Sequence, residues 1–182
     1  GLDVAPLSFG QRRLWFLERA GSGGAAYNIA VVARLAGRPD VAALGDALAA
    51  VVARHEVLRS GVVSDGPEPL QRVHAAVAVP LPVHDLRTVD APRRAAALEA
   101  ALDAEARRPF DLVTPPLLRA VLHVVADDAS VLQLTVHHAA ADGWSLRVLA
   151  AELSACYDAR RRGAADPLAA LPLQYGDFAA WE

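Results

Sequence analysis

The sequence predicts an α/β sandwich with a mixed sheet, and three of its features support that fold class. Two apolar segments, residues 117–126 and 130–138, flank the short polar segment at Asp127, a pattern typical of a β-hairpin. Other apolar residues recur with the 3.6-residue period of helices, between strand-like segments. The 182 residues are 54% hydrophobic and 21% charged, as in globular rather than disordered chains.

The first half of the chain is expected to alternate helices with strands. The expected elements are a helix at 8–20, a strand at 27–36, a helix from Asp40 to about His55, and strands at 57–63 and 70–79. Ser8 and Asp40 are suitable N-caps because their side-chain oxygens accept hydrogen bonds from free backbone N–H groups. Pro80 and Pro82 indicate a loop or an edge strand after residue 79.

The second half begins with a helix opened by Asp90 and Pro92 that extends to about Arg108. The expected hairpin follows. A further helix is expected from Trp144 to about Arg162, with Gly163 as its C-terminal stop. Residues 164–172, rich in Ala and Pro, are interpreted as a linker, and residues 173–182 as the first turns of another helix.

Composition excludes several classes of function. The formal net charge is -3 and the arginines are scattered, so no nucleic-acid surface is expected. Neither a signal sequence nor an apolar segment of membrane-spanning length is present, so no membrane partner is expected. The single cysteine, Cys156, lies in an apolar helical stripe with Leu149 and Leu153. We expect it to be buried, and the cysteine usage favours the reducing cytoplasm.

The segment with the strongest chemical signal is residues 136–145, VHHAAADGWS, in which two histidines end a strand just before a helix. Adjacent strand residues point to opposite faces, so only one of His137 and His138 faces a given cavity. Strand parity groups His138 with the apolar residues Leu132, Leu134 and Val136, but the chain is already turning there. A histidine suits proton transfer at neutral pH. The alternative is a pair of buried histidines bonded to backbone.

Two other chemistries fit this segment less well. His138 and Asp142 have a spacing of four, as some zinc ligands do, but they flank a turn and lack a third ligand. We therefore expect no metal site. Ser145 is not on a nucleophile elbow, which disfavours a serine hydrolase.

Five segments together resemble nonribosomal peptide synthetase condensation domains, members of the chloramphenicol-acetyltransferase-like superfamily. His137, His138, Asp142 and Gly143 match the His-His-x-x-x-Asp-Gly signature of this superfamily. Four further segments occur in family order: SFGQRRLWF at 8–16, RHEVLRS at 54–60, PFDLVTPPLLRA at 109–120 and YGDFAAW at 175–181. Gly10 and Ser60 stand where the family usually has Ala and Thr.

The resemblance implies an α/β lobe and an amide-forming reaction. Family domains consist of two similar lobes, so residues 1–182 are expected to be the N-terminal lobe, with the C-terminal lobe absent and the fragment inactive alone. The implied substrates are aminoacyl or peptidyl thioesters on the phosphopantetheine arms of donor and acceptor carrier proteins, with no cofactor bound directly. Neighbouring synthetase domains are the other implied partners.

The resemblance also implies roles for individual residues. His138 is expected nearest the reacting atoms, as a general base or as a hydrogen-bonding group, and Gly143 is expected to let a backbone N–H approach the substrate. His137 is expected to be structural. The resemblance also implies that Asp142 is structural and paired with an Arg of RHEVLRS. Arg59 is the expected partner, because an unpaired guanidinium in an apolar strand is costly, and Arg54 is the runner-up.

Within the family, the segment Asp142–Ser145 together with RHEVLRS and Tyr27-Asn28 is most similar to domains that join two L-residues. An epimerization-domain lobe stays an alternative, as do a non-catalytic platform for carrier proteins and a free-standing acyltransferase that uses coenzyme A. The intact histidine motif disfavours the platform, and RHEVLRS and YGDFAAW disfavour the coenzyme A enzyme.

Overall fold

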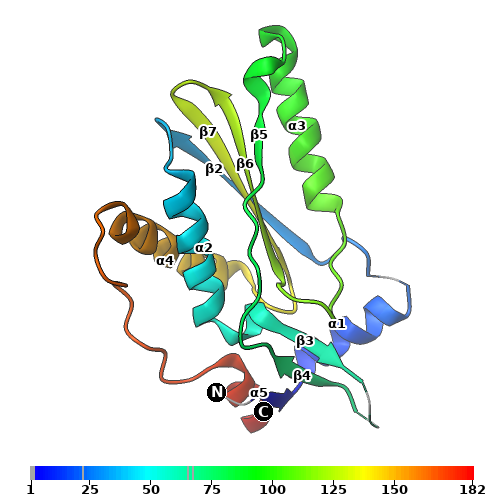
Figure 1. Ribbon diagram of the computed structural model, residues 1–182. Helices are drawn as coiled ribbons and strands as arrows, with labels where there is room; N and C mark the ends of the chain where they lie inside the picture. Colours follow the sequence, from blue (N-terminus) through cyan, green and yellow to red (C-terminus); the bar gives the residue numbers. More distant parts are fainter. Residues whose placement is uncertain (1–2, 22, 65, 67) are drawn as a thin grey trace.

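The computed structural model describes residues 3–21, 23–64, 66 and 68–182 (Figure 1). Its strands form two sheets, a small one of β1, β4 and β3 and a larger one of β2, β7, β6 and β5 in that order. The strands are β1 Val4–Pro6, β2 Asn28–Ala36, β3 Ser60–Val63, β4 Leu70–Val73, β5 Val83–Asp85, β6 Leu118–Ala126 and β7 Ala129–His137. The α-helices are α1 Phe9–Arg19, α2 Val41–Arg54, α3 Ala91–Arg107, α4 Gly143–Arg161 and α5 Tyr175–Trp181.

The larger sheet is mixed, as expected. β6 and β7 form the expected hairpin, in which Leu118 pairs with Val136, and β2 pairs antiparallel with β7 along its whole length. β5, which follows Pro80 and Pro82, is an edge strand and pairs only with β6, in the parallel direction. The expected strand at 27–36 and the hairpin are confirmed to within two residues.

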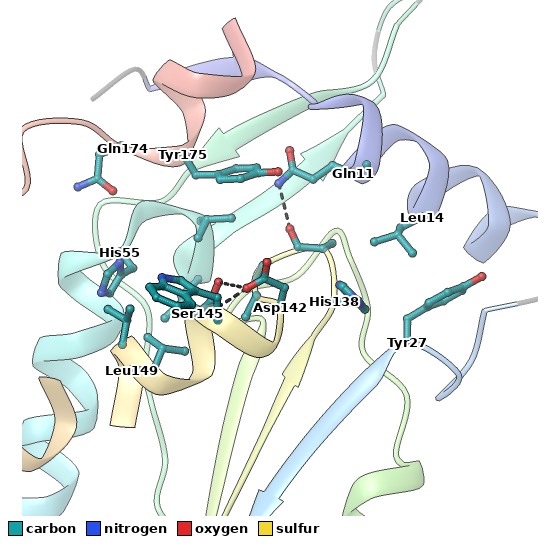
Figure 2. A pocket seen from close by; sticks show the side chains of 18 of the residues that line it. Gln11, Leu14, Tyr27, His55, His138, Asp142, Ser145, Leu149, Gln174 and Tyr175 are labelled. Carbon is teal, nitrogen blue, oxygen red and sulfur yellow. Dashed lines mark hydrogen bonds between the residues drawn. The ribbon is translucent and has the colours of Figure 1, made fainter. Parts of the chain in front are cut away.

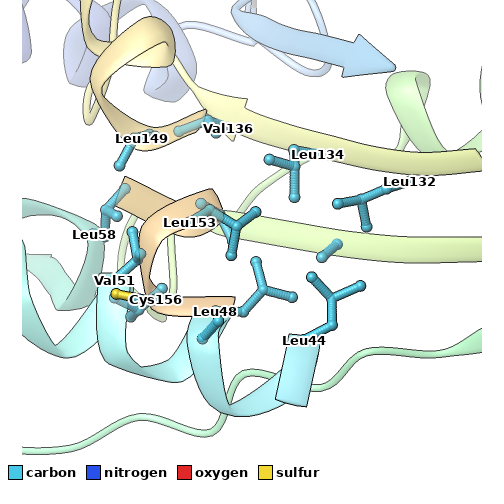
Figure 3. Packing of buried hydrophobic residues seen from close by; sticks show 14 of the residues in the cluster. Leu44, Leu48, Val51, Leu58, Leu132, Leu134, Val136, Leu149, Leu153 and Cys156 are labelled. Atoms are coloured by element: carbon cyan, nitrogen blue, oxygen red, sulfur yellow. The ribbon is translucent and has the colours of Figure 1, made fainter. Parts of the chain in front are cut away.

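Helices cover both faces of this sheet. On one face, Leu132 and Leu134 of β7 pack with α2 and α4 in the main core (Figure 3). The neighbouring residue Gln133 points the other way, and its Nε2 donates to the carbonyl oxygen of Leu102 on α3 at 2.9 Å. Cys156 is 2% exposed within the core, as expected, and burial raises the pKa of its thiol. This arrangement is the expected sandwich.

The small sheet adjoins the lower end of the large one (Figure 1). A second core cluster includes Val62 of β3 and comprises Leu7, Val62, Phe110, Leu112 and Leu117. The N–H of Val62 donates to the carbonyl oxygen of Leu112 at 2.8 Å, which fixes the segment before β6 against β3. The small sheet thus holds the N-terminal strand and α1 at the end of the hairpin.

Capping residues set the helix boundaries where the sequence indicated. Ser8 and Gln11 form a capping box at α1, and Asp40 accepts from Ala43 N at α2. Gly163 has φ +62° just after α4, a conformation that glycine adopts readily. Residues 164–172 contain no helix or strand, in agreement with the linker interpretation.

Two strand predictions were too long. Residues Glu56–Arg59 form a 3-10 helix, η1, before β3, and Ser60 Oγ donates to the carbonyl oxygen of Glu56 at 2.7 Å. β4 ends at Val73, which pairs with Ser60, the first residue of β3; one further backbone bond joins His74 N to the carbonyl oxygen of Arg59 at 3.0 Å, where η1 replaces the strand. A second 3-10 helix, η2, spans Leu86–Thr88. Within the described residues, no helix is long and apolar enough to cross a membrane.

Candidate active site

The two histidines lie at the junction between β7 and α4. β7 ends at His137, and α4 begins at Gly143 after a turn of five residues, 138–142. The backbone N–H of His138 donates to the carbonyl oxygen of Tyr27 at 2.8 Å, and that of Ala140 donates to the carbonyl oxygen of His137 at 2.9 Å. These bonds fix the turn against the start of β2, so both histidines have defined positions.

A pocket of about 690 Å³ adjoins this turn (Figure 2). Its walls come from α1, from η1 and the end of α2, from the β7–α4 turn with the start of α4, and from the segment before α5. Several of the matched motifs therefore meet in one place. The polar lining residues are Gln11, Arg13, Tyr27, His55, His138, Asp142, Ser145, Gln174 and Tyr175.

His138 lines this pocket, and its side chain is exposed. Strand parity would have placed it with Leu132 and Leu134 in the core. The strand ends one residue earlier, however, and the turn directs the imidazole into the pocket (Figure 2). The position is suitable for contact with a bound substrate.

His137 is buried, with 1% of its surface exposed. Its Nδ1 accepts a hydrogen bond from Ala139 N at 3.1 Å, and its ring makes T-shaped contacts with the rings of Tyr27 and Phe110. Burial, with smaller contributions from His138 and Arg119, lowers the pKa of His137 to about 4. A neutral imidazole enclosed by aromatic rings is suited to packing rather than to contact with substrate.

Asp142 does not form the expected ion pair. Its Oδ1 accepts from the backbone N–H of Ser145 at 2.8 Å and from Ser145 Oγ at 2.7 Å, so the carboxylate is the N-cap of α4. These bonds, led by the one from the Ser145 backbone, lower the pKa of Asp142. The residue is exposed, and among the described residues no ion pair links it to His138 or to an arginine.

Arg59 has partners near its own position instead. Its guanidinium donates to the carbonyl oxygens of Ala53 and His74 and lies 3.5 Å from a carboxylate oxygen of Glu56. The prediction that Arg59 pairs with Asp142 is wrong because residues 56–59 are a 3-10 helix rather than a strand. The turn of η1 directs Arg59 toward the end of α2 and the residue after β4.

Gly143 is the first residue of α4, and apart from its chain neighbours and the backbone of its own helix, no atom lies within 4 Å of the position that a Cβ would occupy there. Its φ is not positive, so the backbone conformation does not require glycine. The first N–H groups of a helix lack partners within it. Open space beside such a group suits the close approach that we expected, and this role of Gly143 stays a prediction.

A buried carboxylate beside the pocket was missed. Glu152 on α4 is 9% exposed and accepts from Arg54 Nε at 3.0 Å and from His55 Nε2 at 2.6 Å. The sequence contained a signal, since Glu152 interrupts the apolar stripe of Leu149, Leu153 and Cys156. His55, which follows α2, also lines the pocket.

Residues of the first and last motifs close the other side of the pocket. Gln11 Nε2 donates to the carbonyl oxygen of Ala139 at 3.1 Å (Figure 2). Ser8 Oγ lies 2.9 Å from the hydroxyl of Tyr175. The turn that contains His138 is therefore tied to α1, and α1 to α5. Within the described residues, no group of three His, Cys, Asp or Glu side chains is arranged to hold a metal ion.

Comparisons with known proteins identify the family and the fold of this chain. The model of the Condensation domain family matches residues 2–182. The chain is 42% identical over 180 residues to chondramide synthase of Chondromyces crocatus, covering 99% of this chain and 5% of that protein. It superposes on the X-domain of teicoplanin biosynthesis, solved in complex with OxyB, with a TM-score of 0.87 and 36% identity, over 100% of this chain and 38% of that one.

A third relative is the starter condensation domain of rhizomide synthetase, with a TM-score of 0.82 and 26% identity over 91% of this chain and 40% of that one. The fold is thus that of the chloramphenicol-acetyltransferase-like class, with the paired histidines at the end of a central strand. Within this class, the chain belongs to the condensation-domain family. It spans about two fifths of the solved structures and a small part of the curated synthetases that it matches.

Proposed function

We propose that this chain is the N-terminal lobe of a condensation domain that joins two carrier-bound acyl groups through an amide bond. The donor and the acceptor are aminoacyl or peptidyl thioesters on the phosphopantetheine arms of two carrier proteins, in a synthetase of the cytoplasm. The observation that supports this most directly is the position of His138. Its side chain is exposed in a pocket that several family motifs surround, whereas His137 is enclosed.

The reaction requires few groups from the protein. The acceptor amine attacks the thioester carbon, a C–N bond forms, the C–S bond breaks, and the departing sulfur takes up the proton that the amine loses. His138 either accepts that proton or holds the amine by a hydrogen bond, and the N–H of Gly143 is offered beside it. Orienting the two tethered reactants contributes as much to the rate as proton transfer does, because the reaction no longer depends on a bimolecular encounter of the amine and the thioester.

The test uses a complete condensation domain containing this chain, with one carrier protein charged as donor and another as acceptor. We expect a dipeptide on the acceptor carrier, and we expect His138→Ala to lower its rate of formation by about a hundredfold or more. The melting temperature should change little because the side chain is exposed. His84→Ala, at an exposed histidine of β5 that does not line the pocket, is the matched control and should leave the rate unchanged.

A further variant separates the two roles of His138. Gln can form hydrogen bonds but cannot act as a base at neutral pH. If His138 positions the amine, His138→Gln should retain most of the rate, and if it is a base, His138→Gln should resemble His138→Ala. We also propose that both residues joined are L-configured, and the stereochemistry of the dipeptide tests this. An epimerization-domain lobe would form no dipeptide and would instead invert the Cα of a carrier-bound residue.

The likeness to the X-domain favours one alternative. That domain was solved in complex with OxyB, so a lobe of this fold can serve as a binding partner. If this chain belongs to a non-catalytic platform, the complete domain will bind its partner proteins and form no dipeptide. His138→Ala will then leave the binding of those partners unchanged.

A further inference from the structure

The pocket contains a second imidazole that the proposed reaction does not use. His55, the residue after α2, donates from Nε2 to Oε2 of Glu152 at 2.6 Å, and Arg54 donates from Nε to the other carboxylate oxygen at 3.0 Å. We call Arg54, His55 and Glu152 the Glu152 cluster. The exposed fractions of the three side chains are 17%, 18% and 12%, so solvent reaches them little.

The Glu152 cluster joins three walls of the pocket. Glu152 comes from α4, and Arg54 and His55 come from the end of α2. Arg54 also donates to the carbonyl oxygen of Ala169 in the segment that leads to α5, while Gln174 Nε2 donates to the carbonyl oxygen of Arg54 at 3.0 Å. An imidazole bonded within such a network has a fixed orientation.

The hydrogen bond to Glu152 shows which nitrogen of the His55 ring carries a proton. An ionised carboxylate only accepts hydrogen bonds, so Nε2 of His55 carries a proton. Whenever the ring is neutral, Nδ1 is therefore its acceptor, and Nδ1 forms no hydrogen bond with the described part of the chain.

His55 lies across the pocket from His138. In Figure 2 the two side chains are on opposite sides, with Asp142 and Ser145 between them. Apolar residues of η1, α4 and the segment before α5 line the same pocket. They are Val57, Val148, Leu149, Leu171 and Leu173.

We propose that His55 is a substrate-binding residue that Glu152 positions, and this rests on the proposed function. Nδ1 of His55 accepts a hydrogen bond from an N–H or O–H group of the acyl chain, whose apolar part packs on the neighbouring Val and Leu side chains. This end of the pocket thereby selects acyl groups that carry a hydrogen-bond donor on an otherwise apolar body.

The first test is His55→Gln in the complete domain. The amide nitrogen of Gln can take the place of Nε2 and keep the bond to Glu152, whereas the Nδ1 acceptor is lost. We expect a rise in KM of about three- to tenfold for a carrier-bound substrate with a donor group, with kcat nearly unchanged and the melting temperature within about 2 °C. His84→Gln, outside the pocket, should change neither constant. An unchanged KM in a stable His55→Gln variant would overturn the proposal.

The second test is Glu152→Gln, alone and combined with His55→Gln. If Glu152 acts through His55, the single variant should raise KM to a similar extent, and the double variant should be no worse than either single variant. Full additivity of the two effects on KM would mean that Glu152 acts independently of His55, and would contradict the positioning role.

A binding measurement separates this proposal from the proposed function. Nitrogen NMR of the histidine rings reports the tautomer of His55 in the free domain and in the presence of an unreactive amide analogue of a phosphopantetheine-bound aminoacyl group. We expect the Nε2–H tautomer and a shift of Nδ1 on binding. If the analogue binds and Nδ1 does not shift, the proposal fails. Failure of the proposed function appears instead as the absence of dipeptide from the unaltered domain, whatever His55 does.

Discussion

His137 and His138 are neighbours in sequence, but their surroundings give them opposite properties. His138 is exposed in the pocket, while His137 is enclosed beside Tyr27 and Phe110. Burial lowers the pKa of His137 to about 4, whereas a histidine in an unfolded chain has a pKa near 6.5. Between these two values the unfolded chain binds a proton that the folded chain does not, so acid favours unfolding.

We therefore predict that this chain loses stability as the pH falls from 7 to 4. The folded pKa is the lower one, so the contribution of His137 is complete above about pH 6.5 and is lost on the way down to pH 4. One such group accounts for about 3 kcal/mol at most, from roughly 1.4 kcal/mol per pH unit. Urea unfolding at several pH values measures it.

His137→Asn provides the comparison, because the Asn oxygen can accept from Ala139 N as Nδ1 does. This variant should be less stable at pH 7, and its free energy of unfolding should fall less steeply between pH 6.5 and pH 4. The pKa of His123 is also lowered by burial, so some slope will remain. Equal slopes in the two proteins would show that His137 is not the group responsible.

At the residue scale, the sequence predicted that His138 and His137 have different surroundings better than it predicted the contacts of Asp142 and Arg59. The match to the motif singled out His138, and the structure places that side chain in the pocket, although strand parity favoured the core. Parity failed because β7 ends at His137. The partner of Asp142 was not predictable from spacing, since Ser145 competes for the carboxylate within one helical turn.

At the scale of elements, the N-terminus of α4 depends on Asp142. The carboxylate satisfies the Ser145 N–H and bears a negative charge at the positive end of the helix. Because Asp142 is a cap rather than half of a buried ion pair, we predict that Asp142→Ala costs about 1 kcal/mol, or roughly 2–4 °C in melting temperature. Thermal unfolding followed by circular dichroism measures this.

Two variants serve as controls for this prediction. Asp142→Asn keeps an acceptor for Ser145 and should lose less than Asp142→Ala. Asp40→Ala removes the corresponding cap of α2, which accepts from Ala43 N at 3.0 Å, and should cost a similar amount. A drop of about ten degrees for Asp142→Ala alone would instead match the loss of one partner of a buried ion pair.

Elements with a strong periodic pattern were predicted well, and elements decided by long-range pairing were not. The β6–β7 hairpin and the long helices follow from the pattern of apolar residues and their caps. Strand-like residues 57–59 became a 3-10 helix, and β4 stopped at Val73, because tertiary pairing set those limits. Glu152 shows the same limit, since its partners come from a helix almost a hundred residues earlier in the chain.

For the whole molecule, large apolar side chains of the pocket lining and of α5 face solvent. Trp144 is 70% exposed and Leu173 72% exposed, and both line the pocket. Trp181 of α5 is 82% exposed. Side chains of this size are seldom left in water together unless another surface covers them. The chain also spans about two fifths of the solved structures that it matches.

We predict that the 182-residue chain alone does not form the amide bond, even though His138 already lies in its pocket. Condensation requires both tethered reactants to be held in line, and this orientation contributes several kcal/mol that a pocket open on one side does not provide. Charged donor and acceptor carriers mixed with the chain should give no dipeptide above background. The same carriers mixed with a complete condensation domain, in which this chain is joined to a C-terminal lobe, should give product.

Circular dichroism of the isolated chain checks that it is folded, so that inactivity is not mistaken for unfolding. Dipeptide formation by the folded chain alone, at a rate near that of the complete domain, would mean that this lobe suffices for catalysis and that positioning by a second lobe is not required.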